Sequence, residues 1–391
     1  MKITSNMTIT LPMAHINPVC FVWVFFWVFI TRIVAENRHK FKELFVFSAD
    51  GMMEGMKLVP RIAIDFGSHM IRVVADDTEK NVFSERSLLV RKVVSGEILA
   101  IGEAAEDHVL VSGEELVAPI RNGIMVDYEG ASALIAYVLR QIASWWHVFK
   151  PHVVIAESLS LSRALSQALG EVVQVAGGGK VYMTPVPSLA ALGAGIDPRD
   201  SVGNLILDIG AGTTEAAIIS RGSSVSATSA PIGGYDLSQA VVVYLENKYG
   251  VDISDSTAAD IIQTGGSALR RDDDGTHEFY ANEKDTGEAK VLTITGNEIT
   301  EVIAKPLQQI LGTVSWVVHR TPTTLLSDIA QNGITVTGGV GNLRHVDTYL
   351  KRELALPVRV VQRPEDAVIS GGREALRFVS RFKQTVPQSS A

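Results

Sequence analysis

The feature that most constrains this sequence is a pair of matched turns, one in each half of the chain. Asp65-Phe66-Gly67-Ser68 and Asp208-Ile209-Gly210-Ala211-Gly212-Thr213-Thr214-Glu215 each follow an apolar, strand-like segment and precede another. Glycine lets backbone N–H groups approach a ligand closely, and the serine and threonine hydroxyls add donors, so each turn can hold phosphate oxygens. Two such turns predict duplicated halves that face one ligand.

The two aspartates suit a magnesium ion, because each can hold Mg²⁺ through the ion's water shell. Either turn alone is explained more simply as a tight hairpin that requires glycine, and the pair makes that explanation weaker. The sequence has no G-x-x-x-x-G-K-[ST] motif, and neither turn opens directly into a helix, which excludes the Walker and Rossmann phosphate loops. A third glycine-rich turn, Thr337 to Leu343, could let a base or ribose lie against backbone. Taken alone, such a turn more commonly just connects a strand to a helix.

Short β-branched runs alternate with helical periodicity along the folded part, which favours an α/β architecture. We expect strands at 61–65, 71–75, 152–156, 180–184, 204–209, 216–220, 224–231 and 333–337. We expect helices at 129–148, 160–169, 188–193, 237–249, 299–319, 343–353 and from 370 or 371 to 382. The densely charged stretch 270–288 predicts a solvated surface loop or hairpin.

Size and charge narrow the function classes. At roughly 150 residues per domain, 391 residues suggest two or three domains. Acidic side chains outnumber basic ones by 8, which argues against general nucleic-acid binding. The single cysteine, Cys20, excludes an internal disulfide, a zinc cage of cysteines and an iron–sulfur cluster. A reducing compartment is compatible with this but does not follow from it.

The N-terminal segment differs from the rest, because Val19 to Ile30 is an unbroken apolar run of twelve residues. This run is short of the ~20 residues that span a bilayer as a helix, and extending it would bury Arg32. It is either a hydrophobic membrane anchor or upstream sequence translated from too early a start, with Met52, Met53 or Met56 the real beginning. We favour the early start, because the first strand-like segment follows these methionines directly.

Six separated segments carry a resemblance to a known family. The two hairpin turns, the Thr337-Gly338-Gly339 turn, and the segments Pro119 to Glu129, Pro231 to Ile253 and Pro357 to Leu376 together resemble the actin superfamily, and most closely bacterial MreB. The resemblance runs from about Arg61 to Phe378. It implies an α/β, actin-like fold of two duplicated lobes, each with a mixed sheet flanked by helices, and a cleft between them for ATP and Mg²⁺.

The resemblance also implies domain boundaries and site residues. The expected parts are an N-terminal extension at 1–56, lobe I at 57–202 completed by 365–382, lobe II at 203–364 and a polar tail at 383–391. The residues implied for the first phosphate loop are Asp65, Gly67 and Ser68; those for the second are Asp208, Gly210, Gly212, Thr213 and Thr214; Gly338 and Gly339 would contact adenosine. Asp65 and Asp208 would hold Mg²⁺ through water, and Asp208 is the expected catalytic residue.

MreB proteins polymerise into membrane-associated filaments that organise cell-wall synthesis in rod-shaped bacteria. The resemblance therefore implies a cytoplasmic, membrane-associated protein whose partners are further copies of itself, the inner membrane surface and cell-wall synthesis proteins, with no nucleic acid. Two alternatives on the same fold are a nucleotide-independent scaffold and a phosphotransferase or chaperone-type ATPase. Against the chaperone alternative, we expect no appended peptide-binding domain, because only a short polar tail follows Phe382.

Three sites depart from the family pattern. Val186 takes the place of the glutamate that positions the attacking water, and such help is worth ~10²- to 10⁴-fold in rate, so we expect weak hydrolysis. Ile262 and Thr264 take the places of the Lys and Glu that help to hold the nucleoside. The first loop reads Ser68-His69-Met70-Ile71 where the family has a run with asparagine and threonine. A turn histidine such as His69 more commonly faces solvent than a phosphate.

Overall fold

The computed structural model describes residues 59–76, 82–142 and 150–378. The chain divides into two units, 1–58 and 59–391, and the described residues all belong to the second. The apolar run 19–30, Cys20, the end of the helix predicted at 129–148 and the polar tail lie outside the described residues. Within the described part, no helix combines the length and the apolar character needed to cross a bilayer.

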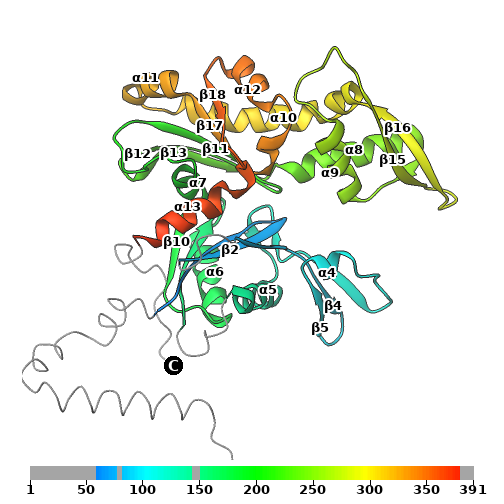
Figure 1. The fold of residues 1–391 in the computed structure, drawn as a ribbon, viewed down its shortest axis with the longest axis horizontal. Coiled ribbons are helices and arrows are strands. Elements are labelled where there is room, and N and C mark those ends of the chain that lie inside the picture. The colour runs from blue at the N-terminus through cyan, green and yellow to red at the C-terminus, as the bar shows by residue number, and fades with distance from the viewer. Residues whose placement is uncertain (1–58, 77–81, 143–149, 379–391) are drawn as a thin grey trace, which may run out of the picture. The chain divides into compact units, whose positions relative to one another are not determined.

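Two five-stranded sheets with the same strand order form the framework (Figure 1). Lobe I is built on β10 (Val181–Pro185), β9 (His152–Glu157), β1 (Arg61–Phe66), β2 (Met70–Ala75) and β3 (Phe83–Arg86), in that order. Lobe II is built on β18 (Val358–Val360), β17 (Ile334–Thr337), β11 (Asn204–Ile209), β12 (Thr214–Ser220) and β13 (Ser223–Ala230). In both sheets the central strand is antiparallel to its hairpin partner and parallel to the strand on its other side. The prediction of two duplicated lobes with mixed sheets is confirmed.

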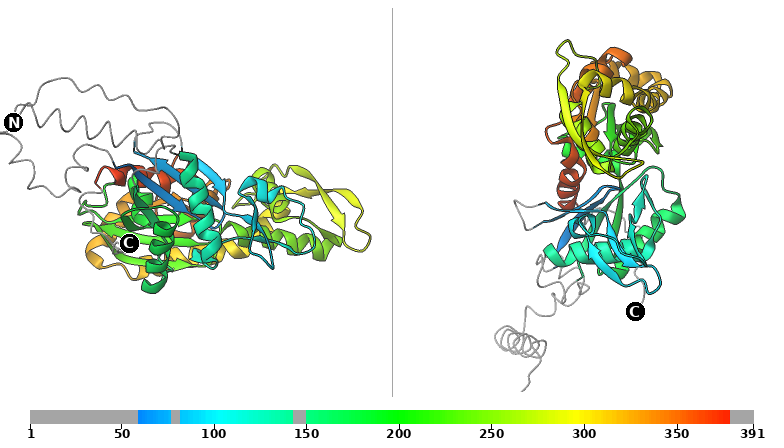
Figure 2. Two further views of the ribbon diagram at one scale, coloured as in Figure 1. Left: turned by 90° about the horizontal axis from the view of Figure 1, so that it is seen from below. Right: turned by 90° about the vertical axis from the view of Figure 1, so that its right-hand side faces the viewer.

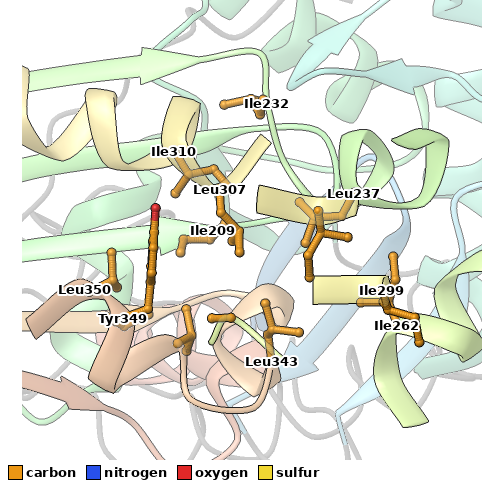
Figure 3. Close-up of a cluster of buried hydrophobic side chains, with 14 of the residues drawn as sticks. Ile209, Ile232, Leu237, Ile262, Ile299, Leu307, Ile310, Leu343, Tyr349 and Leu350 are labelled. Atoms are coloured by element: carbon orange, nitrogen blue, oxygen red, sulfur yellow. The ribbon is translucent and has the colours of Figure 1, made fainter. Parts of the chain in front are cut away.

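Helices cover the outer face of each sheet through separate apolar cores. In lobe I, α5 (Tyr128–Ile142) and α6 (Arg163–Val175) pack against the β1–β2 hairpin and β9. In lobe II, α8 (Gly234–Tyr249), α10 (Gly296–His319), α11 (Thr323–Asn332) and α12 (Val346–Leu354) pack on the second sheet. Figure 3 shows Ile209 of β11 close to Leu307 and Ile310 of α10, with Tyr349 and Leu350 of α12 beside them.

Two short helices, α7 (Val186–Gly193) and α13 (Ala367–Leu376), lie between the sheets (Figure 1), and α13 is the red helix in Figure 2. Their buried residues share one apolar cluster with Val154 of lobe I and Ile206 of lobe II. The helices cross closely, because a Cβ on Gly371 would overlap the carbonyl oxygen of Leu189, and one on Gly193 would overlap that of Ala367. Glycine at both positions is therefore required by the packing.

Smaller elements complete each lobe. Lobe I adds a three-stranded sheet, β5 (Ile98–Ile101), β4 (Leu89–Lys92) and β6 (Glu114–Val117), the helix α4 (Glu103–Glu106) and the hairpin β7–β8 (Ile120–Arg121, Ile124–Met125). Lobe II adds α9 (Asp255–Gly265) and a three-stranded sheet of β14 (Val251–Asp252), β15 (Thr276–Glu283) and β16 (Ala289–Thr295). The hairpin alternative for 270–288 is thus the observed one, whereas α4, α9, α11 and the small sheets were not predicted.

Several predicted boundaries are wrong for local reasons. Helix α6 begins at Arg163 rather than at 160, because the Ser162 hydroxyl caps it by accepting the Leu165 N–H at 3.3 Å. Between β17 and α12 the chain forms a 3₁₀ turn, η1 (Gly339–Asn342), so the helix predicted from 343 begins only at Val346. Helix α13 begins at Ala367, directly after the 3₁₀ turn η2 (Pro364–Asp366), and ends at Leu376. The expected lobe boundaries stay predictions: 202/203 lies in the connection before β11, and 364/365 lies within η2.

Candidate functional site

The two glycine turns have the same local geometry and touch each other. The Gly67 N–H donates to the Met70 carbonyl at 3.0 Å, and the Gly210 N–H donates to the Thr213 carbonyl at 2.8 Å. A Cβ on Gly212 would lie 2.9 Å from Ser68 Oγ, so the two turns are in close contact at this point. The duplicated hairpins therefore meet where the two lobes face each other.

A cavity of about 160 Å³ lies at this meeting point. Of the residues predicted for the site, those that line the cavity are Asp65, Gly67, Ser68, Val186, Asp208, Gly210, Gly212, Thr213, Gly338 and Gly339. Thr214 is not among them, because its side chain is fully buried and its hydroxyl donates to the Ile232 carbonyl at 2.8 Å. Thr214 thus fixes the start of β12 rather than facing the cavity.

The carboxylates of Asp65 and Asp208 share the cavity and repel each other. Burial raises the pKa of Asp65 to about 6, with Arg72 opposing the shift and Asp208 adding to it. Burial also raises the pKa of Asp208, although Thr337 Oγ1 donates to Asp208 Oδ1 at 2.7 Å and opposes that shift. A cation between the two would relieve this repulsion. Two carboxylates that line one cavity are a donor set that fits an ion held through its own water, as Mg²⁺ prefers.

Sequence reasoning missed the residues that stand opposite the two aspartates. In the hairpin registers, Asp65 pairs with Arg72 and Asp208 pairs with Glu215. Arg72 Nη1 lies 4.0 Å from Asp65 Oδ2, and Arg72 Nε lies 3.3 Å from Asp366 Oδ1. The signal was present in the sequence, because both residues occupy the same position in the two matched hairpins. The lobe I aspartate therefore faces a cation, whereas the lobe II aspartate faces a second acid.

Glu215 is a buried acid on the cavity wall. Its side chain is 1% exposed, and its Oε1 accepts hydrogen bonds from the Ser158 hydroxyl and, at 3.2 Å, from the Leu159 N–H. Its Oε2 has no hydrogen-bond partner in the structure. Burial raises the pKa of Glu215 to about 8, and the negative charge of Asp208 contributes to the shift. At neutral pH this carboxyl group is mostly protonated and can donate a hydrogen bond.

A second cavity, of about 250 Å³, adjoins the first on the lobe II side. It is formed by the start of α8, by Ile262 and Gln263 of α9, and by Val340 and Asn342 of η1, and it shares His69, Gly210, Ala211 and Gly339 with the first cavity. Ile262 belongs to the lobe II core (Figure 3), so this wall offers apolar contact. Thr264 does not line the cavity, and its hydroxyl donates to the Asp260 carbonyl at 2.7 Å.

His69 and Tyr235 bridge the lobes between the two cavities. Tyr235, in the first turn of α8, donates its hydroxyl to the Ser68 carbonyl at 3.1 Å, and its oxygen lies 3.2 Å from His69 Nδ1. Arg86 Nη1 lies 2.7 Å from the same nitrogen and also pairs with Glu106. Burial and the charge of Arg86 lower the pKa of His69 to about 4, so the ring is neutral at pH 7. The expectation of a solvent-facing histidine was therefore wrong.

Comparison with known proteins identifies relatives of the whole described unit. Residues 59–384 match the family model of the MreB/Mbl protein. The cell shape-determining protein MreB of Escherichia coli (strain K12) is 31% identical over 67% of this chain and 76% of its own, and Mbl of Bacillus subtilis (strain 168) is 29% identical over 74% and 88%. The crystal structure of Spiroplasma citri MreB5 bound to AMPPNP superposes with a TM-score of 0.77 at 28% identity, covering 83% of this chain and 97% of its own. A MamK double helical filament subunit shares the fold at 16% identity, with a TM-score of 0.67, covering 81% of this chain and 98% of its own.

Proposed function

Because the chain belongs to the MreB/Mbl family and has an actin-like fold, we propose that it is a cytoskeletal protein that binds ATP and Mg²⁺ between its lobes. The observation that carries this proposal is the contact of two matched glycine turns, one from each lobe, at a cavity that also contains Asp65 and Asp208. One triphosphate gripped by both turns would hold the lobes together. Spiroplasma citri MreB5, which was crystallised with AMPPNP and with ADP, supports a nucleotide as the ligand.

The proposed ligand contacts follow the two cavities. Backbone N–H groups within the turns at Gly67–Ser68 and Gly210–Thr213 would donate to phosphate oxygens, except those of Gly67 and Gly210, which already bond to carbonyl groups within their own turns. Asp65 and Asp208 would hold the water shell of Mg²⁺, which supplies positive charge to the phosphates. Gly338 and Gly339 would let the nucleoside lie against backbone, with its base in the apolar second cavity. Thr214 is omitted from this set, because its hydroxyl is already bonded within lobe II.

We expect hydrolysis to be weak. Val186 lines the cavity at the start of α7 and has no group that can orient a water molecule. Glu215 also lines the cavity, but its Oε1 already accepts hydrogen bonds from the Ser158 hydroxyl and the Leu159 N–H. The nucleotide would then act mainly by favouring one arrangement of the lobes over another.

The proposed cellular role is a cytoplasmic, membrane-associated filament that takes part in cell shape or cell-wall organisation. Head-to-tail contacts that do not close into a ring would produce such a filament from one kind of subunit. The inner membrane surface and cell-wall synthesis proteins are its proposed partners. The support is the family membership, together with relatives whose names describe them as cell shape-determining.

The decisive binding experiment is a titration with a fluorescent ATP analogue, with and without Mg²⁺. We expect saturable, Mg²⁺-dependent binding that is lost in Asp208→Ala and kept in Asp347→Ala, which changes an exposed aspartate on α12. Equal binding by wild type and Asp208→Ala would contradict the proposed site. Sedimentation of the wild-type chain with AMPPNP and Mg²⁺ tests polymerisation, and a chain that stays monomeric would contradict the filament.

A nucleotide-independent scaffold is the second candidate, and the bridge across the cleft favours it. The Tyr235 hydroxyl bonds to the Ser68 carbonyl and lies within hydrogen-bond distance of His69, so protein groups alone link the lobes across the cleft. A chain that polymerises equally well with and without nucleotide, and that does not bind the fluorescent analogue, would identify the scaffold.

A further inference from the structure

A third cavity, of about 300 Å³, lies outside the nucleotide cleft, where α7 ends and α13 begins. It shares no lining residue with the two cleft cavities. We call it the α13 cavity. The groups on its wall that can bond a ligand are Gln362, Arg363, Asp366, Ser370 and Arg373.

Arg373, on the wall of this cavity, has buried donor groups without hydrogen-bond partners. Its Nε and Nη2 atoms are buried and have no hydrogen-bond partner in the structure. Since a guanidinium group is always charged, these are ionised donors removed from water without compensation, which is costly. An acceptor that enters the cavity would remove this cost.

The neighbouring carboxylates are already engaged. Asp366 is the acid that lines the α13 cavity within the described part of the chain, and it pairs with Arg72 at 3.3 Å and also with Arg363. Glu374, next to Arg373 on the same helix, pairs with Arg377 at 2.7 Å. The cavity therefore carries two arginines against one carboxylate, and that carboxylate is shared with the cleft residue Arg72.

We propose that the α13 cavity binds a small oxyanion. The planar fork of a guanidinium group matches two oxygens of a phosphate or a carboxylate, and Arg373, whose Nε and Nη2 lack partners, lines this cavity. The Ser370 hydroxyl and the Gln362 amide add neutral donors on the same wall. Phosphate and carboxylate ligands share a pair of oxygens that such a fork can bind. The volume of the α13 cavity limits the ligand to a small anion or to one end of a larger one.

The test is the melting temperature of the full chain in chloride, inorganic phosphate or acetate at equal ionic strength, with saturating AMPPNP and Mg²⁺ to occupy the cleft. We expect phosphate, acetate or both to raise the melting temperature above that in chloride. The more effective anion identifies the ligand class. No rise with either anion would overturn the proposal.

Variants assign the effect to the cavity. In Arg373→Met, a near-isosteric apolar side chain replaces the unpaired charge, so we expect a melting temperature in chloride at least as high as that of wild type and an anion affinity at least tenfold weaker. The matched control is Arg377→Met, which changes the exposed arginine one turn further on and should respond to anions as wild type does. Ser370→Ala, which removes one donor without disturbing a helix, should weaken binding in the same direction. An unchanged response in both Arg373→Met and Ser370→Ala would overturn the proposal.

The nucleotide proposal and the α13 cavity proposal can be refuted independently of each other. If the chain binds no nucleotide, the anion response of wild type and its loss in Arg373→Met can still be measured without AMPPNP. Phosphate that binds in the cleft instead would raise the melting temperature of Arg373→Met as much as that of wild type, and would lose its effect in Asp208→Ala.

Discussion

At the residue scale, the β1–β2 and β11–β12 hairpins have the same backbone geometry, but the residues opposite their aspartates carry opposite charges. Arg72 stands opposite Asp65 and compensates its charge, whereas Glu215 stands opposite Asp208 and adds to the negative charge of the cavity. Burial raises the pKa of both acids, Asp65 to about 6 and Glu215 to about 8. The cleft thus holds protons that an unfolded chain would release.

Glu215→Gln tests whether the raised pKa of Glu215 makes the stability of the folded chain depend on pH. Between about pH 4.5, the ordinary value, and pH 8, folded Glu215 keeps a proton that the unfolded chain has lost. The contribution of Glu215 to the free energy of unfolding is therefore greatest below this pH window. As the pH rises through the window, the free energy of unfolding falls by up to about 1.4 kcal/mol per pH unit. Asp65 adds a decline of the same sign up to about pH 6.

The measurement is urea unfolding between pH 5 and 8.5, where Glu215→Gln should show a flatter profile than wild type. Glu288→Gln, at an exposed position on the β15–β16 hairpin, is the control and should keep the wild-type slope. Parallel profiles for wild type and Glu215→Gln would show that this carboxyl group is already ionised in the folded chain.

Val186→Glu tests the origin of slow hydrolysis. A carboxylate at the start of α7 would face the cavity beside Asp208, where it could orient water, so we expect phosphate release from ATP to accelerate by ~10²- to 10⁴-fold. Val175→Glu, which places the same side chain at an exposed position at the end of α6, should have no effect. Unchanged turnover in a Val186→Glu variant that still binds the ATP analogue would show that another feature limits the reaction.

At the element scale, the sequence was most informative where the determinants are local. The turns at Asp65 and Asp208 were predicted because an apolar strand, a glycine and a hydroxyl occur within a few residues. Helix α9 was missed because its buried side chains are few and its sequence is polar, and α11 buries only Ile329. Such helices depend on contacts with the rest of the lobe, which a local pattern does not contain.

In the candidate site, too, features set by nearby residues could be predicted, and contacts between distant segments could not. The cavity-lining turn residues could be predicted from spacing, and Arg72 and Glu215 could have been found by comparing the two hairpins. The bridge between His69 and Tyr235 could not, because it joins a turn of lobe I to the first turn of a lobe II helix. The hydroxyl bond that takes Thr214 out of the cavity is likewise visible only in three dimensions.

Gly371→Ala tests the crossing of α7 and α13. The added methyl group would overlap the Leu189 carbonyl oxygen, so the helices must separate, and we expect a loss of about 1–3 kcal/mol in the free energy of unfolding. The matched control is Gly312→Ala in α10, where a Cβ meets no atom within 4 Å, so the same change should stabilise the chain by up to about 1 kcal/mol. Equal effects of the two substitutions on urea unfolding would contradict the close crossing.

At the scale of the whole folded unit, the lobes are connected by more than the shared apolar cluster. A chain of ion pairs runs from Asp65 through Arg72 and Asp366 to Arg363, so the first glycine turn is linked to the wall of the α13 cavity. His69 and Tyr235 supply a second link across the cleft. A ligand that engages both turns would act on all these contacts together, which is how a nucleotide could favour one arrangement of the lobes.

The most direct test of the central claim is a crystal structure of the chain with AMPPNP and Mg²⁺. We expect one triphosphate between the turns at Gly67–Ser68 and Gly210–Thr213, a hydrated Mg²⁺ beside Asp65 and Asp208, and the base in the cavity beyond His69 and Tyr235. A saturated crystal with AMPPNP bound elsewhere, or with these turns still in mutual contact and no nucleotide between them, would contradict the claim.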